Sequence, residues 1–264
     1  MRCEWFDWFP RHVDRYDSRQ DSVALWALGE AGFIPKTAAT TIYIDPYVGG
    51  SVVSEGVVLH RMIPIPFNPS SVSKIDATVI THEDLDHLDE NFIFPVSENT
   101  TCTFIGPLGV AELLESWKIA EDRIISLEEN EQTEIRGIRI IALPSNNANP
   151  KTANTYLLDT GNVRVFYSGD SLYLVKFAEI GNRYQIDIAA ISLGRNPTGA
   201  KWYNDPTEAL QIAKDLKAKV LIPMHWDLWH NTLEDPHLVE REAEKKRCNI
   251  RIVPLRVGER FVYP

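Results

Sequence analysis

The sequence of 264 residues has few cysteines, no long apolar segment and no excess of basic residues. Its three cysteines, Cys3, Cys102 and Cys248, lie far apart and form no C-x-x-C pair, which favours reduced thiols over a disulfide framework. No segment approaches the roughly 18 apolar residues of a membrane span. The N-terminal stretch M-R-C-E-W-F-D-W-F-P-R lacks the apolar core of a signal peptide. We therefore expect a cytoplasmic protein with no membrane partner.

The lack of positive charge excludes a second group of functions. The formal net charge is −10 and the pI is about 5.2. An acidic chain gains nothing from counterion release on DNA or RNA, so we expect no nucleic-acid partner. The sequence also lacks G-x-S-x-G, a Walker A motif and G-x-G-x-x-G after a strand, which removes the common serine-hydrolase, NTPase and dinucleotide-binding interpretations. The acidic net charge suits a small-molecule substrate, with bound cations offsetting part of the local negative charge.

The hydrophobic content of 44% predicts one α/β domain with a large core. Residues 1–21 are rich in aromatics and are expected to form an arm packed on the body, with a subunit contact in a homo-oligomer as the alternative. Residues 46–75 are rich in Gly, Pro and Ser and predict a long loop of the kind that often covers a site.

Periodicity and turn residues predict the secondary structure of the rest of the chain. Strands are expected at 23–28, 40–45, 77–80, 101–106, 186–192 and 219–223, with hairpins turning at 136–137 and 160–162. Helices are expected at about 88–94, 106–117, 205–218 and 235–247.

The stretch T-V-I-T-H-E-D-L-D-H-L-D-E carries the densest group of metal-ligating residues. A short apolar strand at 77–80 is followed by His82, Asp84, Asp86 and His87. Two imidazoles and two carboxylates this close repel or desolvate one another without a cation, and neutral His and ionised Asp are natural ligands of a divalent metal. The pattern predicts a site for one or two metal ions. The alternative is a polar loop with two surface histidines.

Two further apolar strands end in residues of the same kind. V-R-V-F-Y-S-G-D-S places Asp170 just past a strand, after Gly169 makes room, and K-V-L-I-P-M-H-W-D places His225 in the same way. The carboxyl ends of strands in layered α/β folds gather at one edge, where ligands bind. Either residue alone could be a turn former or a buried histidine. Together with residues 82–87 they predict one metal centre, in which Asp86 and Asp170 orient a metal-activated water as catalytic residues.

The stretch H-E-D-L-D-H resembles the H-x-H-x-D-H signature of the metallo-β-lactamase superfamily, with Asp84 in place of the second histidine. The resemblance implies an α/β fold over residues 1–264, namely a four-layer αββα sandwich of two mixed sheets with outer helices. It further implies one complete metal position and a weaker second one. The complete position consists of Asp86, His87, Asp170 and His225, and the weaker one of His82, Asp84 and Asp170. In place of the superfamily's middle-loop histidine stands A-L-P-S-N-N-A-N-P, where Asn146 or Asn147 offers an amide oxygen. A carboxylate-rich set suits manganese, zinc or iron.

A closer resemblance begins at about residue 159. The segments S-G-D-S, L-G-R-N-P-T-G and K-V-L-I-P-M-H-W-D-L-W-H-N resemble the L-ascorbate-6-phosphate lactonase branch of the superfamily. This branch implies a cytoplasmic hydrolase, often oligomeric, that opens the lactone of a phosphorylated sugar acid. An anionic substrate needs cationic or N–H donors, for which Arg195 is the candidate, followed by Lys151 and Lys201. Asn196 and Asn231 are candidates for substrate contact or for caps of turns.

Three functions remain open at this point. The first is a metal-dependent hydrolase of a small ester or lactone, the second a metal-dependent phosphodiesterase acting on a small phosphodiester, and the third a non-catalytic metal-binding protein. The complete ligand set argues against the third. Asp227 and His230 are expected to have structural roles or to contact the ligands from behind. Trp202, Trp226 and Trp229 are expected in the core or the pocket wall.

Overall fold

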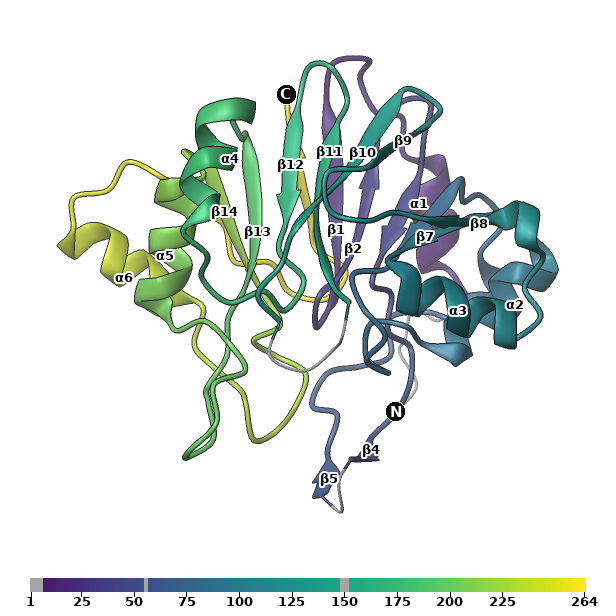
Figure 1. Ribbon diagram of the computed structural model, residues 1–264, viewed down its shortest axis with the longest axis horizontal. Coiled ribbons are helices and arrows are strands. Elements are labelled where there is room, and N and C mark those ends of the chain that lie inside the picture. The colour runs from purple at the N-terminus through teal and green to yellow at the C-terminus, as the bar shows by residue number, and fades with distance from the viewer. Residues whose placement is uncertain (1–6, 55–56, 148–151) are drawn as a thin grey trace.

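Two mixed seven-stranded sheets pack face to face, with helices on both outer faces (Figure 1). The computed structural model describes residues 7–54, 57–147 and 152–264. The four-layer αββα sandwich implied by the superfamily resemblance is confirmed. Cys3, Trp5, Phe6 and Lys151, which the sequence singled out, lie outside the described residues.

The first sheet combines an antiparallel half with a parallel half. Its order is β16-β1-β2-β3-β6-β7-β8, and the pairs from β16 to β3 are antiparallel, whereas those from β3 to β8 are parallel. Its strands are β1 (Val23–Gly29), β2 (Gly32–Lys36), β3 (Ile42–Ile44), β6 (Ala77–Val79), β7 (Thr103–Gly106), β8 (Ile124–Ser126) and β16 (Arg260–Tyr263). Because β1, β3 and β6 run in the same direction, their carboxyl ends share one edge.

The second sheet repeats this layout. Its order is β15-β14-β13-β12-β11-β10-β9, antiparallel from β9 to β12 and parallel from β12 to β15. Its strands are β9 (Gln132–Ile135), β10 (Ile138–Pro144), β11 (Asn154–Asp159), β12 (Arg164–Tyr167), β13 (Ile188–Ser192), β14 (Val220–Met224) and β15 (Arg251–Ile252). The hairpins predicted at 136–137 and 160–162 are confirmed as β9–β10 and β11–β12.

Alternation along the strands divides the apolar residues between two sides of each sheet. In β1, Val23, Leu25 and Ala27 face the core between the sheets, whereas Ala24, Trp26 and Leu28 face the outer helices. All seven residues of β1 are buried, because both faces of the strand are covered.

Three helices cover each sheet. On the first sheet lie α1 (Phe9–Arg15), α2 (Glu90–Asn99) and α3 (Leu108–Ser116), and on the second α4 (Lys176–Tyr184), α5 (Pro206–Asp215) and α6 (His237–Lys245). Helix α2 begins at Glu90 and not at the predicted Leu88, because the side chain of Asp89 accepts the N–H of Asn91 as an N-cap. Phe9 and Val13 of α1 are buried against the first sheet, so the described part of residues 1–21 packs on the body.

The long loop predicted at 46–75 contains a small hairpin of β4 (Val52–Ser54) and β5 (Val57–Leu59), which projects from the lower end of the molecule (Figure 1). Buried Arg61 holds the base of this loop. Its guanidinium donates to the carbonyl oxygens of Gly49, Ile63 and Pro64 and lies over the Tyr47 ring.

Candidate metal centre

The polar side chains that follow five strands meet at one edge of the sandwich. The sequence predicted three of these strand ends, namely those after β6, β12 and β14, which carry the 82–87 stretch, Asp170 and His225. The structure adds Glu30 after β1 and Asp45 after β3. The site therefore draws on both sheets, and the backbone N–H of His225 donates to the carbonyl oxygen of Glu30 at 2.8 Å across the gap between them.

Hydrogen bonds from buried Asp45 and Thr81 orient the histidines of the 82–87 stretch. His87 places Nδ1 2.8 Å from Asp45 Oδ2, and Thr81 Oγ1 donates to the same oxygen at 2.7 Å. Because the only hydroxyl hydrogen of Thr81 is committed to Asp45, His82 Nδ1 must donate to Thr81 Oγ1, at 2.9 Å. Both imidazoles thus carry their hydrogen on Nδ1 and present the lone pair of Nε2 to the site.

The first ligand group consists of Glu30, Asp86, His87 and His225, whose ligand atoms all lie within 4.8 Å of one another. Glu30 Oε1 lies 2.7 Å from His225 Nε2 and 3.3 Å from His87 Nε2. Asp170 Oδ1 lies 3.5 Å from each of these two nitrogens. The structure thus brings together the predicted set of Asp86, His87, Asp170 and His225 and adds Glu30 to it.

Glu30 is the ligand that sequence reasoning missed. It occupies the turn between β1 and β2 with φ +57°, and its side chain is only 1% exposed. The preceding Gly29, with φ +83°, is required there because a Cβ would lie 2.2 Å from Ile63 Cδ1. The sequence offered one signal, namely a glutamate in a Gly-x-x-Gly turn directly after an apolar strand.

The second ligand group consists of His82, His87 and Asp170. Asp84 lies beside it, with Oδ2 3.4 Å from His82 Nε2 and a side chain that is 38% exposed. Asn147 lines the same pocket, whereas Asn146 donates from Nδ2 to the carbonyl oxygen of Tyr173. Glycine is favoured at position 169, before Asp170, because φ is +50° and a Cβ there would lie 2.9 Å from the Thr81 side chain.

The charges of these side chains require a cation. Six carboxyl groups lie in or directly behind the site, and three histidines face them; the carboxyl groups are Glu30, Asp45, Asp84, Asp86, Asp170 and Asp227. Burial raises the pKa of Glu30 to about 7, against the opposing effect of His87 and His225. Burial alone would lower the pKa of His225, but Asp170 and Glu30 raise it to about 10. Without metal, His225 holds a proton in place of a cation.

Several buried atoms of ligand type have no hydrogen-bond partner within the described part of the chain. They are both carboxylate oxygens of Glu30, Oδ1 of Asp170, Nε2 of His82 and His87, and both ring nitrogens of His225. The 2.7 Å approach of Glu30 Oε1 to His225 Nε2 is a contact between charged groups without hydrogen-bond geometry. Buried polar atoms are rarely left in this state, and atoms that converge on one point are satisfied together by a metal ion. The residues present therefore fit a divalent metal.

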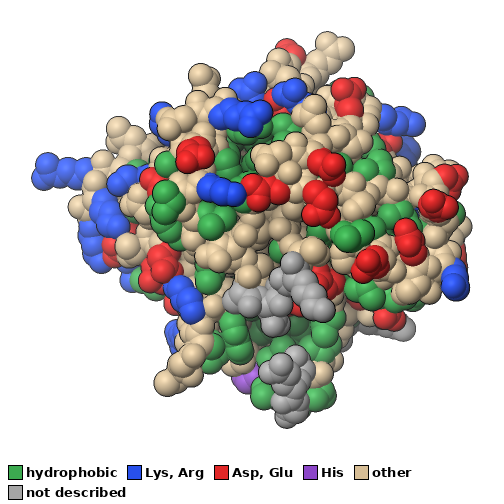
Figure 2. All heavy atoms as spheres, in the orientation of Figure 1, with side chains coloured by type: hydrophobic (Ala, Val, Ile, Leu, Met, Phe, Trp, Pro, Cys, Tyr) green, Lys and Arg blue, Asp and Glu red, His purple; other side chains and the backbone are tan. Residues whose placement is uncertain are grey.

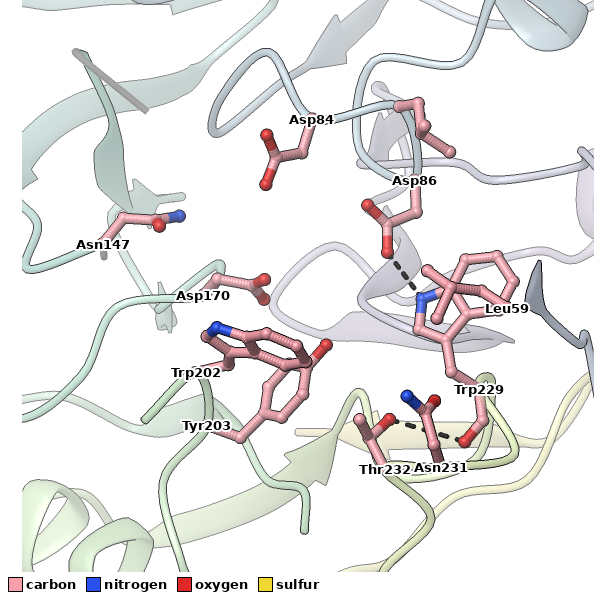
Figure 3. Close-up of a pocket in the computed structure, with 11 residues that line it drawn as sticks. Leu59, Asp84, Asp86, Asn147, Asp170, Trp202, Tyr203, Trp229, Asn231 and Thr232 are labelled. Carbon is pink, nitrogen blue, oxygen red and sulfur yellow. Dashed lines mark hydrogen bonds between the residues drawn. The ribbon is translucent and has the colours of Figure 1, made fainter. Parts of the chain in front are cut away.

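Two residues support the ligands from behind. Asp227 Oδ1 accepts the backbone N–H of Glu30 at 2.9 Å, which fixes the strained turn. Trp229 Nε1 donates to Asp86 Oδ2 at 2.9 Å, which orients that carboxylate (Figure 3). His230 is exposed and contacts His60.

A cavity of about 190 Å³ opens onto the ligands. The carboxylates of Asp84, Asp86 and Asp170 point into it from one side, and aromatic rings form the facing wall (Figure 3). The wall and rim consist of Leu59, Leu85, Trp202, Tyr203 and Trp229, with Asn147, Asn231 and Thr232 as polar members.

Of the three residues predicted to bind substrate, only Asn231 lines this pocket, and its buried Oδ1 has no partner among the described residues. Asn196 organises the adjacent loop, where its Oδ1 accepts the N–H groups of Trp202 and Tyr203. Arg195 is exposed and is not among the described residues of the lining, and Lys201 pairs with Glu208. The substrate roles of these residues stay predictions.

Residues 40–226 match the family described as "Beta-lactamase superfamily domain". The chain is also 28% identical to the "Probable L-ascorbate-6-phosphate lactonase UlaG" of Salmonella gallinarum and to that of Salmonella newport, over 99% of this chain and 86% of each relative. The alignment spans 306 positions, which exceeds the 264 residues of this chain, so the chain lacks segments that these relatives have.

Solved structures share the fold at lower identity. An isothiocyanate hydrolase from Delia radicum gut bacteria superimposes with a TM-score of 0.75 at 16% identity, covering 91% of this chain and 98% of its own. The metallo hydrolase Igni18 from Ignicoccus hospitalis gives 0.72 at 18% identity, with 92% and 99% coverage. CmlA, a diiron β-hydroxylase from Streptomyces venezuelae, gives 0.67 at 14% identity, with 91% and 54% coverage. The part of the chain that the structure describes contains no helix long and apolar enough to cross a membrane.

Proposed function

The chain belongs to the metallo-β-lactamase superfamily, and from this premise we propose that it hydrolyses a small ester or lactone with a metal-activated water. One observation carries the proposal. Unpartnered ligand atoms from both sheets converge on one point, and a small cavity opens directly onto them. The printed names of the curated relatives, which describe lactonases, favour a cyclic ester.

A divalent cation held by Glu30, Asp86, His87 and His225 would supply an activated water and polarise the substrate carbonyl. The chain's own residues then act around it. Asp86 accepts the indole N–H of Trp229 on Oδ2, so its Oδ1 remains available to orient the water and take its proton. Burial alone would raise the pKa of Asp170, but the facing His225 and His87 hold it well below its usual value, so Asp170 stays ionised.

We propose one strong metal position and one weaker one. Both ligand groups contain His87, whose Nδ1 is committed to Asp45 and whose Nε2 can serve only one ion. The first group contains Glu30, whose side chain is 1% exposed, whereas the additional carboxylate beside the second group, Asp84, is 38% exposed. Carboxylates and imidazoles are equally represented among the candidate ligands, with three of each, which suits manganese or iron as well as zinc.

The test combines metal content with turnover. Protein purified without added metal is analysed for elements against protein concentration, then assayed with γ-butyrolactone and with bis(p-nitrophenyl) phosphate. We expect about one equivalent of metal and turnover of the lactone. Two equivalents with turnover of the phosphodiester would favour the phosphodiesterase, because paired metals serve phosphoryl oxygens. Absence of metal after reconstitution with manganese, iron or zinc would refute the proposal.

A further inference from the structure

The pocket lining carries no fixed cation. Among the described residues that line the cavity, none is lysine, arginine or histidine, and three are aspartates. A phosphate group on a substrate is recognised in proteins by arginine, lysine or clustered N–H donors. Two described cations close in sequence to the lining have partners elsewhere: Arg61 donates to three carbonyl oxygens and Lys201 pairs with Glu208.

What the pocket offers instead is flat apolar surface. The indole of Trp202 is 46% exposed, and Leu85 on the same pocket is 44% exposed. Trp202 does not owe its exposure to a loose loop, because Asn196 Oδ1 accepts the N–H groups of both Trp202 and Tyr203, at 2.7 and 2.9 Å. Asn196 Nδ2 also donates back to the carbonyl oxygen of Tyr203. Three hydrogen bonds thus tie the backbone of Trp202 and Tyr203 to Asn196, one through Trp202 and two through Tyr203. An exposed indole on a backbone fixed in this way at a cavity mouth is a platform for a ring.

The apolar character continues outward from the cavity. Leu59 lines the pocket at the end of β5, and the hairpin before it exposes Val53, Val57 and Val58. Hydrophobic side chains are visible at this lower end of the molecule, around the β4–β5 hairpin (Figure 2). Among the polar members of the lining, Asn231 has a buried Oδ1 with no partner among the described residues, so this oxygen can accept a hydrogen bond from a ligand.

We propose that the pocket takes an uncharged substrate with a flat apolar ring, seated on Trp202, and that it does not select a phosphorylated one. This inference rests on the proposed hydrolase function. It differs from the anionic substrate that the sequence led us to expect. The cavity of about 190 Å³ lies below the roughly 300–1,000 Å³ of pockets for drug-sized ligands, so the substrate is small.

The test separates binding from turnover in the metal-loaded protein. Calorimetry compares the uncharged lactam analogue of dihydrocoumarin, which resists hydrolysis, with glucose 6-phosphate. Dihydrocoumarin and γ-butyrolactone serve as substrates. We expect the lactam to bind more tightly than the sugar phosphate and dihydrocoumarin to have the higher kcat/KM of the two lactones.

Three variants assign the effect to the platform. Trp202→Ala should weaken lactam binding by roughly three- to tenfold, the contribution expected of a stacked ring. Trp202→Lys should weaken it as much and should strengthen binding of glucose 6-phosphate. Trp8→Ala is the matched control, because Trp8 is also an exposed tryptophan, at 54%, but stacks on His12 of α1 and is not among the lining residues; it should change neither affinity.

The outcomes distinguish failure of the proposed hydrolase function from failure of the Trp202 platform. Lactam binding that depends on Trp202 without turnover of either lactone would support the platform and overturn the hydrolase. Turnover of γ-butyrolactone together with tighter binding of glucose 6-phosphate would support the hydrolase and overturn the platform. Lactam affinity equal in wild type and Trp202→Ala, or no lactam binding at all, would also overturn the platform.

Discussion

Glu30→Gln should stabilise the metal-free protein and weaken metal binding at the same time. The glutamate is fully buried among other carboxylates, and burial raises its pKa from 4.5 to about 7. The folded protein therefore keeps a proton on Glu30 that the unfolded chain releases between these values. The stability that this group contributes is complete below pH 4.5 and is lost as the pH rises through about 7.

The magnitude follows from the width of that window. One pKa unit corresponds to about 1.4 kcal/mol, so a shift from 4.5 to about 7 corresponds to about 3 kcal/mol of lost stability at pH 8. Glutamine keeps the shape of glutamate but carries no charge to desolvate, so the variant escapes this loss. The same change removes an anionic ligand from a group of four, and we expect at least a tenfold weaker affinity for metal.

Urea denaturation of chelator-treated protein at pH 5 and pH 8 measures the first effect, and metal titration at pH 8 measures the second. The stability gain of Glu30→Gln over wild type should grow by about 2–3 kcal/mol from the lower to the higher pH. Glu115→Gln is the matched control, because Glu115 is exposed on α3. A metal-free variant less stable than wild type at pH 8, or one with unchanged metal affinity, would refute the assignment of Glu30.

Three further changes test the rest of the site. Trp229→Phe removes the N–H that orients Asp86, and we expect kcat to fall roughly tenfold in steady-state kinetics; an unchanged kcat would show that this hydrogen bond does not position the carboxylate. His225→Ala should remove the metal and the activity, whereas Asp84→Ala should keep most of the metal because Asp84 is half-exposed. Elemental analysis measures the metal content of both variants. More metal lost from Asp84→Ala than from His225→Ala would show that the strong and weak positions are assigned the wrong way round. Arg61→Met leaves three carbonyl oxygens without their donor, and a loss of about 2–4 kcal/mol is expected in urea denaturation; a loss below about 1 kcal/mol would mean that the loop does not depend on this side chain.

Local sequence pattern predicted several strands and turns of this protein. An apolar run indicates a strand, and the turn residues that follow it indicate where the strand ends. The apolar runs of β1, β13 and β14 predicted these strands, and the turns at 136–137 and 160–162 predicted two hairpins. The helix predicted from about residue 205 begins at Pro206, because the side chain of Asp205 accepts the N–H groups of Thr207 and Glu208 as an N-cap. The hairpin within residues 46–75 was not predicted, because its strands are only three residues long and pair beside Gly- and Pro-rich sequence.

The sequence by itself identified the candidate ligands that follow strand ends with a clear signature: His82, Asp86 and His87 in one stretch, and Asp170 and His225 after two buried strands. Only the tertiary structure decided that Glu30 joins them. Glu30 lies in a short turn, where its sequence context does not distinguish it from an ordinary polar turn residue. Its role arises from contact with His225, nearly two hundred positions away in the sequence. Periodicity reports which face of a strand is buried, but it carries no information on which turn of one sheet meets which strand end of the other. That pairing depends on how the two sheets pack through their shared core, and the packing places Glu30, His87 and His225 at a single point.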